Sequence, residues 1–121
     1  MPFDVHAVRS HNRLYLKVWG HVSPDRVFDC ASATITEASK LRPGFDAILD
    51  VSGLTSLPDS CLPHVARIDE FLVSSGVRRV VRVCGRLPEL VVKLERQART
   101  TGYSAHLATS MGEAEALLDG R

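Results

Sequence analysis

The hydrophobic positions of the chain change period along its length, and each change marks a predicted element. Apolar residues alternate with polar ones over residues 3–8 and 14–19, which is the pattern of half-buried strands. Ser10-His11-Asn12 separates the two stretches and is typical of a tight connection, so together they predict a β-hairpin. The residues on its predicted buried face are Phe3, Val5, Leu14, Leu16 and Val18.

A helix is predicted next, because Ser23 and Pro24 form an N-cap followed by a proline in the first turn. Apolar residues then recur at helical spacing. The set expected to form the buried stripe is Val27, Phe28, Ala31, Ile35 and Ala38.

The segment 45–51 is almost continuously apolar, which predicts a strand covered on both faces within a parallel sheet. Gly53 and Pro58 end this strand. Asp59 and Ser60 follow, and side chains of this kind cap helices, so we expect a helix from about Asp59 to Gly76.

The remaining elements alternate in the same way. Val80, Val81 and Val83 predict a strand that stops at Gly85. The later segments predict a helix opened by Pro88, a short strand and a final helix capped by Ser110 with Glu113: residues 88–102, 103–108 and 110–118. The chain is therefore predicted to be a single-domain α/β protein of order ββαβαβαβα. Its mixed five-stranded sheet begins with the hairpin, continues in parallel strands and carries about four helices.

Composition narrows the function classes. With 121 residues and 45% hydrophobic residues, the chain can bury one core and hardly two, so residues 1–121 are expected to be one domain. The net charge of +1 gives no field that would favour nucleic acid. The basic residues concentrated from Arg78 to Arg99, with Arg82 and Arg86 among them, are expected to solvate the ends of strands and helices.

The cysteines and the N-terminus indicate a cytoplasmic protein. Cys30, Cys61 and Cys84 are an odd number, widely spaced in apolar surroundings, so we expect buried thiols in a reducing compartment, without disulfides or a metal site. The N-terminal residues show no signal-peptide core, and no apolar run approaches the length of a membrane span.

Two lines of residues run along the predicted helix that begins at Asp59. The core line is Cys61, Val65, Ile68 and Leu72. The line beside it is Ser60, His64, Arg67 and Phe71, which we interpret as a recognition strip for a protein partner. The alternative is that Ser60 only caps the helix, Phe71 packs at the core margin, and the two basic side chains are solvated.

The stretches LYLKVWGHVS, FDAILDVSGLTSLPDSCL and RRVVRVCG resemble the STAS domain family, which is named for sulfate transporters and anti-sigma factor antagonists. Members have an early strand ending in a glycine turn, a central apolar strand ending near an Asp, and an Asp-Ser pair opening the next helix. The resemblance implies a non-enzymatic regulatory domain in which Ser60 is phosphorylated by a partner kinase and the unmodified surface binds a regulatory protein, such as an anti-sigma factor. The chain departs from the family at Cys61 and Leu62, where a small residue and Gly are common, and at Ser23, where an acidic residue is common.

The sequence is also compatible with functions of other classes. A scaffold subunit that docks constitutively in a transport or stress-signalling complex, with Ser60 never modified, is the main alternative, and a carrier of a small lipid or nucleotide in an apolar pocket is another. Cys61 and His64 could form a nucleophile pair, but helical phase points Cys61 into the core. No glycine-rich phosphate loop is present, so the sequence predicts no cofactor.

Overall fold

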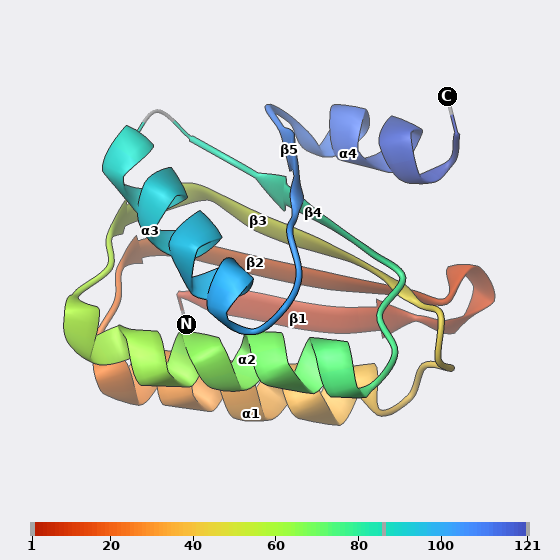
Figure 1. The fold of residues 1–121 in the computed structure, drawn as a ribbon, viewed down its shortest axis with the longest axis horizontal. Coiled ribbons are helices and arrows are strands. Elements are labelled where there is room, and N and C mark those ends of the chain that lie inside the picture. The colour runs from red at the N-terminus through yellow and green to blue at the C-terminus, as the bar shows by residue number, and fades with distance from the viewer. Residues whose placement is uncertain (1, 86, 121) are drawn as a thin grey trace.

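The computed structural model describes residues 2–85 and 87–120, and within them the predicted order of strands and helices is confirmed (Figure 1). The strands are β1 (Phe3–Val8), β2 (Arg13–His21), β3 (Asp46–Ser56), β4 (Arg79–Val83) and β5 (His106–Ala108). The α-helices are α1 (Pro24–Ala38), α2 (Leu62–Ser74), α3 (Pro88–Thr100) and α4 (Met111–Leu118). Two 3-10 turns, η1 (Arg9–His11) and η2 (Asp59–Cys61), precede β2 and α2.

The five strands form one mixed sheet in the order β1-β2-β3-β4-β5. β1 is antiparallel to β2, and every later pair is parallel. In the hairpin Phe3 lies opposite Val18 and Val5 lies opposite Leu16, so the predicted apolar residues share one face of the sheet.

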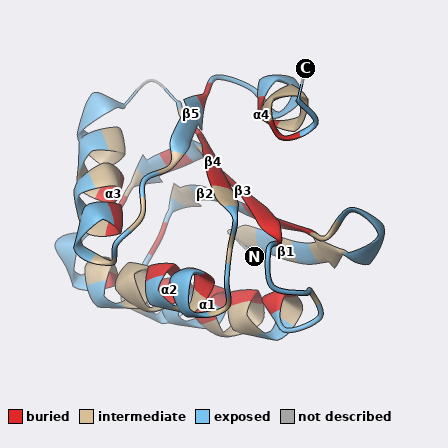
Figure 2. Cartoon of the chain, turned by 45° about the vertical axis from the view of Figure 1, so that its right-hand side comes forward, coloured by how far each residue is buried: buried red, intermediate tan, exposed pale blue. Residues whose placement is uncertain are grey.

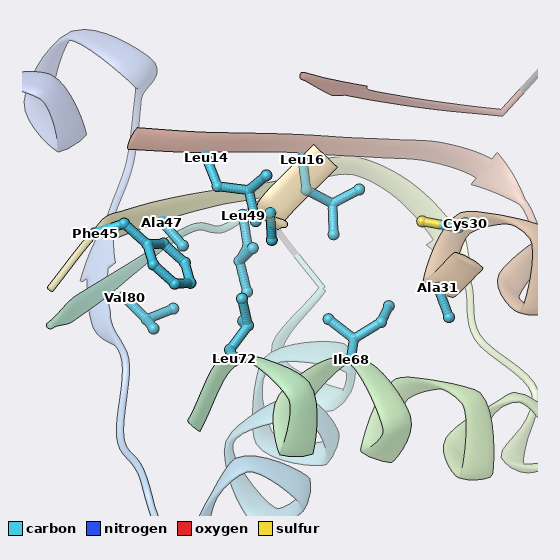
Figure 3. Packing of buried hydrophobic residues seen from close by; sticks show 11 residues of the cluster. Leu14, Leu16, Cys30, Ala31, Phe45, Ala47, Leu49, Ile68, Leu72 and Val80 are labelled. Atoms are coloured by element: carbon cyan, nitrogen blue, oxygen red, sulfur yellow. The ribbon is translucent and has the colours of Figure 1, made fainter. Parts of the chain in front are cut away.

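Helices cover both faces of the sheet, which explains the continuous apolar run of β3. α1 and α2 contact each other and pack on one face, whereas α4 packs on the other (Figure 1). Ala47 and Leu49 of β3 join the core under α1 and α2 (Figure 3), and Ile48 joins the core under α4. Buried positions accordingly lie on the strands and on the inner sides of the helices (Figure 2). The prediction of a strand buried on both faces is confirmed.

Capping residues set the ends of several helices as expected. The Ser23 hydroxyl accepts a hydrogen bond from the Arg26 amide at 3.4 Å, and the Ser110 hydroxyl accepts one from the Glu113 amide at 3.1 Å. Gly76 follows the end of α2 with a φ of +84°, a conformation that favours glycine.

Two predictions about the core and its surroundings were wrong in detail. Phe28 is 48% exposed, because the buried side of α1 is completed by Cys30 and Thr34 instead. The last strand begins at His106 rather than at Tyr103, whose backbone N–H is bonded to the carbonyl of Ala98 at the end of α3.

The basic residues of the second half do more than solvate chain ends. Arg82 is only 2% exposed and forms an ion pair with Glu95 of α3, which contradicts the prediction of a solvated arginine. Arg78 pairs with Asp46 at 2.7 Å, and Arg79 donates to the carbonyl of Leu118 at 2.8 Å. Arg86 lies outside the described residues.

Candidate functional site

Ser60 lies where the sequence placed it, at the start of the second helix, and its side chain is exposed. It is the middle residue of η2, which runs directly into α2. The amino end of a helix carries a partial positive charge from the aligned peptide dipoles. A negative group added at Ser60 would therefore sit in a favourable field with respect to α2.

Ser60 and Asp59 do not cap α2, which corrects one expectation. The N-cap position is Cys61, and no side-chain capping bond is made there. Instead, backbone carbonyls of the 3-10 turn accept the hydrogen bonds of the first amides. The N–H of Cys61 donates to the carbonyl of Pro58, and the N–H of Leu62 donates to the carbonyl of Asp59. The hydroxyl of Ser60 is thus not needed to hold the helix end.

Asp59 is tied to α3. Its carboxylate accepts a hydrogen bond from Lys93 Nζ at 2.7 Å, and the same ammonium donates to the carbonyl of Leu57 at 2.9 Å. The hydrogen bond from Lys93 holds the pKa of Asp59 below its ordinary value. The Asp59 side chain is 83% exposed, so this pair fixes the turn while leaving Asp59 open to a partner.

His64 and Arg67 meet a residue that the sequence analysis had placed in the core. The ring of Phe28, from α1, makes an edge contact with the His64 ring at 5.6 Å between centroids. The Arg67 guanidinium lies 5.0 Å from the centre of the Phe28 ring, and its Nη2 donates to the Ser32 hydroxyl at 3.4 Å. Two helices therefore present one aromatic, one imidazole and one cation together.

Phe28 is the residue that sequence reasoning missed as a surface candidate. It lies one position from Val27, and so about 100° away around the helix from the buried line. Assigning the buried face of this helix strictly by its angular position would have placed Phe28 outside the core. Phe71, in contrast, is half-buried against the main core cluster, so it lies at the core margin. We call Phe28, Ser60, His64 and Arg67 the Ser60 surface; α1 contacts both η2 and α2 here.

The thiols offer no nucleophile at this surface. Cys61 has no exposed area, and burial raises the pKa of its thiol above the ordinary value. A reactive cysteine needs the opposite shift together with access to solvent. Cys30 is also buried, and burial raises its thiol pKa to about 12.

No protein-family model matches the chain, and no curated protein matches it. Within residues 2–85 and 87–120, no group of three or more His, Cys, Asp or Glu side chains is arranged to hold a metal ion. None of the helices in the described part of the chain combines the length and hydrophobicity needed to cross a membrane.

A second polar cluster lies inside the protein, between α2, α3 and β4. Asp69 of α2 is 2% exposed and accepts a hydrogen bond from the Tyr103 hydroxyl at 2.6 Å. Burial raises the pKa of Asp69 to about 6; the Tyr103 hydrogen bond and the charge of Arg82 oppose the rise, and Glu70 and Glu95 add to it. Among the described residues, Oδ2 of Asp69 is one of the few buried polar atoms without a hydrogen-bond partner.

The raised pKa of Asp69 predicts a pH-dependent stability. Its folded value of about 6 exceeds the ordinary value of 3.8, so the folded state binds more protons between these values and stability falls as pH rises through them. The difference between these two pKa values corresponds to about 3 kcal/mol of stability. Urea unfolding of Asp69→Asn and the wild type should therefore show the variant gaining most of this amount, relative to wild type, between pH 4 and pH 7. A difference that does not change with pH would contradict the assignment.

Proposed function

We propose that the chain is a non-enzymatic regulatory domain of STAS type, which binds a cytoplasmic partner protein through the Ser60 surface and is switched by phosphorylation of Ser60. The observation that carries the proposal is the exposed serine just before α2, together with an exposed aromatic side chain of α1 that contacts His64 in α2. Exposed aromatics next to an arginine are the residue types that dominate protein interfaces. The order of strands and helices is also the one expected for such a domain.

The proposed partner is a regulatory protein such as an anti-sigma factor or a serine kinase. Phe28 supplies the apolar anchor, and Arg67 and His64 supply cationic and hydrogen-bonding contacts around it. Asp59 lies at the edge of the surface, and Phe71 supports it from the core margin. Aromatic anchors with a polar surround are the usual arrangement of an interface hot spot.

Phosphorylation would act at the interface rather than on the fold. A phosphoserine adds about −1.5 to −2 charges, and a negative group at the amino end of a helix is stabilising. Asp59 already places a carboxylate next to Ser60, and Lys93 is engaged by that carboxylate. Because Lys93 is held by Asp59 and the Arg67 guanidinium is held against Phe28 and Ser32, the new charge would meet the partner surface only partly neutralised, and desolvation and repulsion would weaken binding.

Ser60→Asp is expected to weaken binding of the partner roughly a hundredfold, because a penalty of about 3 kcal/mol at the interface corresponds to that factor. The thermal midpoint should stay nearly unchanged, since exposed substitutions alter stability by about 0.5 kcal/mol or less. Binding is measured by calorimetry with a partner captured from native lysate by the wild-type chain. Ser60→Ala is the matched control and should bind like wild type. Equal affinities for Ser60→Asp and the wild type would reject the switch.

A separate measurement tells the switch from a constitutive scaffold. The intact mass of protein purified from its native host, with and without phosphatase, should show one removable phosphate that maps to Ser60. A chain that is never modified under any growth condition, yet stays bound in a stable assembly, would favour the scaffold function instead.

A further inference from the structure

A groove runs along the surface between α3 and the start of α2. Its volume is about 610 Å³. Asp59 and Leu62 line it on the α2 side, and residues of α3 line the other side. None of the four residues that define the Ser60 surface lines this groove. It is therefore a second surface, which begins at the chain neighbour of Ser60 and continues along α3.

The groove side of α3 carries one apolar residue between two opposite charges. Leu94 and Ala98 form the buried side of this helix. Glu89, Val92 and Arg96 are three and four residues apart, so they form one line on the outer side, which is exposed (Figure 1, Figure 2). Val92 is 53% exposed. Neither Glu89 nor Arg96 takes part in the ion pairs found in the described part of the chain.

The order of charges makes this line complementary to itself. Glu89 and Arg96 are about two helical turns apart, and Val92 lies within one residue of the midpoint between them. An antiparallel second copy of α3 would therefore bring each glutamate to the arginine of the other copy, with the two valines between the charge pairs. A parallel copy would place like charges side by side, which is unfavourable. The charges thus select one orientation.

The other residues of the groove fit the same arrangement. Leu62 and Pro88 add apolar surface on either side of the valine. Lys93 is already held by the Asp59 carboxylate at 2.7 Å and by the carbonyl of Leu57 at 2.9 Å. An incoming glutamate would therefore find Arg96 as the open cation of this line.

We propose that α3 forms the contact between two copies of this chain, packed antiparallel so that Glu89 of each copy pairs with Arg96 of the other and the two Val92 side chains meet. Such a contact is isologous, since the same residues serve both copies. A foreign segment of one charge sign would match only one end of the line, whereas a second copy matches both. Exposed ion pairs contribute little each, so the dimer is weak and reversible. The proposal is independent of the function proposed for the Ser60 surface.

Sedimentation velocity of the full chain at concentrations up to about 1 mM measures the dimer. We expect the wild type to show a reversible equilibrium between monomer and dimer. Val92→Lys should weaken the dimer at least tenfold, because it places a charge at the centre of the contact; the side chain is exposed, so the fold is kept. Arg42→Glu is the matched control, since Arg42 is exposed and does not line the groove, and it should dimerise like the wild type.

A charge exchange identifies the pairing. Glu89→Arg and Arg96→Glu should each weaken the dimer at least tenfold, because symmetry places like charges together twice. An equimolar mixture of these two variants should restore dimerisation to about the wild-type level, since both contacts of the mixed pair again join opposite charges. A wild type that stays monomeric at about 1 mM would overturn the proposal and leave the groove to another protein. Single variants that dimerise like the wild type, or a mixture that stays monomeric, would also overturn it.

Discussion

Replacing Arg82 with leucine is expected to lower the free energy of unfolding by about 3–5 kcal/mol, because it leaves a charged partner inside the protein without its counter-charge. The side chains of Arg82 and Glu95 are 3% and 18% exposed, so without the guanidinium the Glu95 carboxylate would keep only limited contact with water. Asp69 loses its nearby cation as well, and the pKa of that carboxyl should rise further. Urea unfolding of the variant and the wild type measures the difference.

Two controls separate the buried pair from ion pairs in general. Replacing Arg82 and Glu95 together by leucine should recover most of the loss, since an apolar pair of similar volume is often neutral or stabilising relative to a buried ion pair. Lys40→Met breaks the pair with Glu37, whose cation is 43% exposed rather than 3%, and should cost about 1 kcal/mol or less. A loss below about 1 kcal/mol in Arg82→Leu would mean that the site is hydrated.

Local patterns were sufficient to predict the architecture. Alternation over the hairpin, the continuous run of β3 and the 3.6-residue spacing of the helices each depend on residues within one element, as do the caps at Ser23 and Ser110. Such signals are strong because one face of every strand or helix must be buried. The order of elements and the parallel sheet follow from them.

The features that sequence reasoning missed depend on contacts between distant segments. Arg82 is solvated in a local view, and only the folded chain brings Glu95 of α3 against it. Tyr103 has the β propensity of a strand residue, yet its hydroxyl is held by Asp69, 34 residues away. The prediction that Asp59 or Ser60 caps α2 was wrong for a different reason: backbone carbonyls within η2 already accept hydrogen bonds from these amides.

Only the residues of the candidate site that belong to the second helix and the turn before it could be predicted from the sequence. Ser60, His64 and Arg67 follow from helical phase, since residues three or four apart share a face. Phe28 belongs to another helix, and its approach to His64 depends on how α1 and α2 pack. A surface assembled from two elements therefore requires a structure.

Phe45→Ala and Phe28→Ala make the same chemical change in opposite environments. We expect Phe45→Ala to have the larger effect on stability and Phe28→Ala the larger effect on partner binding. Phe45 is 1% exposed in the main core, so its truncation should lower the free energy of unfolding by about 3–5 kcal/mol, measured by urea unfolding. Phe28 is 48% exposed, and its loss should cost about 1 kcal/mol or less, mainly from the contact with Arg67. A core-sized loss in Phe28→Ala would place Phe28 in the core after all.

For partner binding we expect the larger effect from Phe28→Ala, so this variant is the more direct test of the Ser60 surface. At temperatures where both variants are folded, Phe28→Ala should weaken binding by 2 kcal/mol or more, about thirtyfold, as expected for an aromatic hot spot. Phe45→Ala should bind like wild type, because Phe45 lies beneath the sheet's helices and not on the surface. Leu107→Ala, which removes a side chain of similar exposure from β5, should also leave binding unchanged. If Phe28→Ala and Leu107→Ala bind alike, the partner docks elsewhere and Phe28 has no role in recognition.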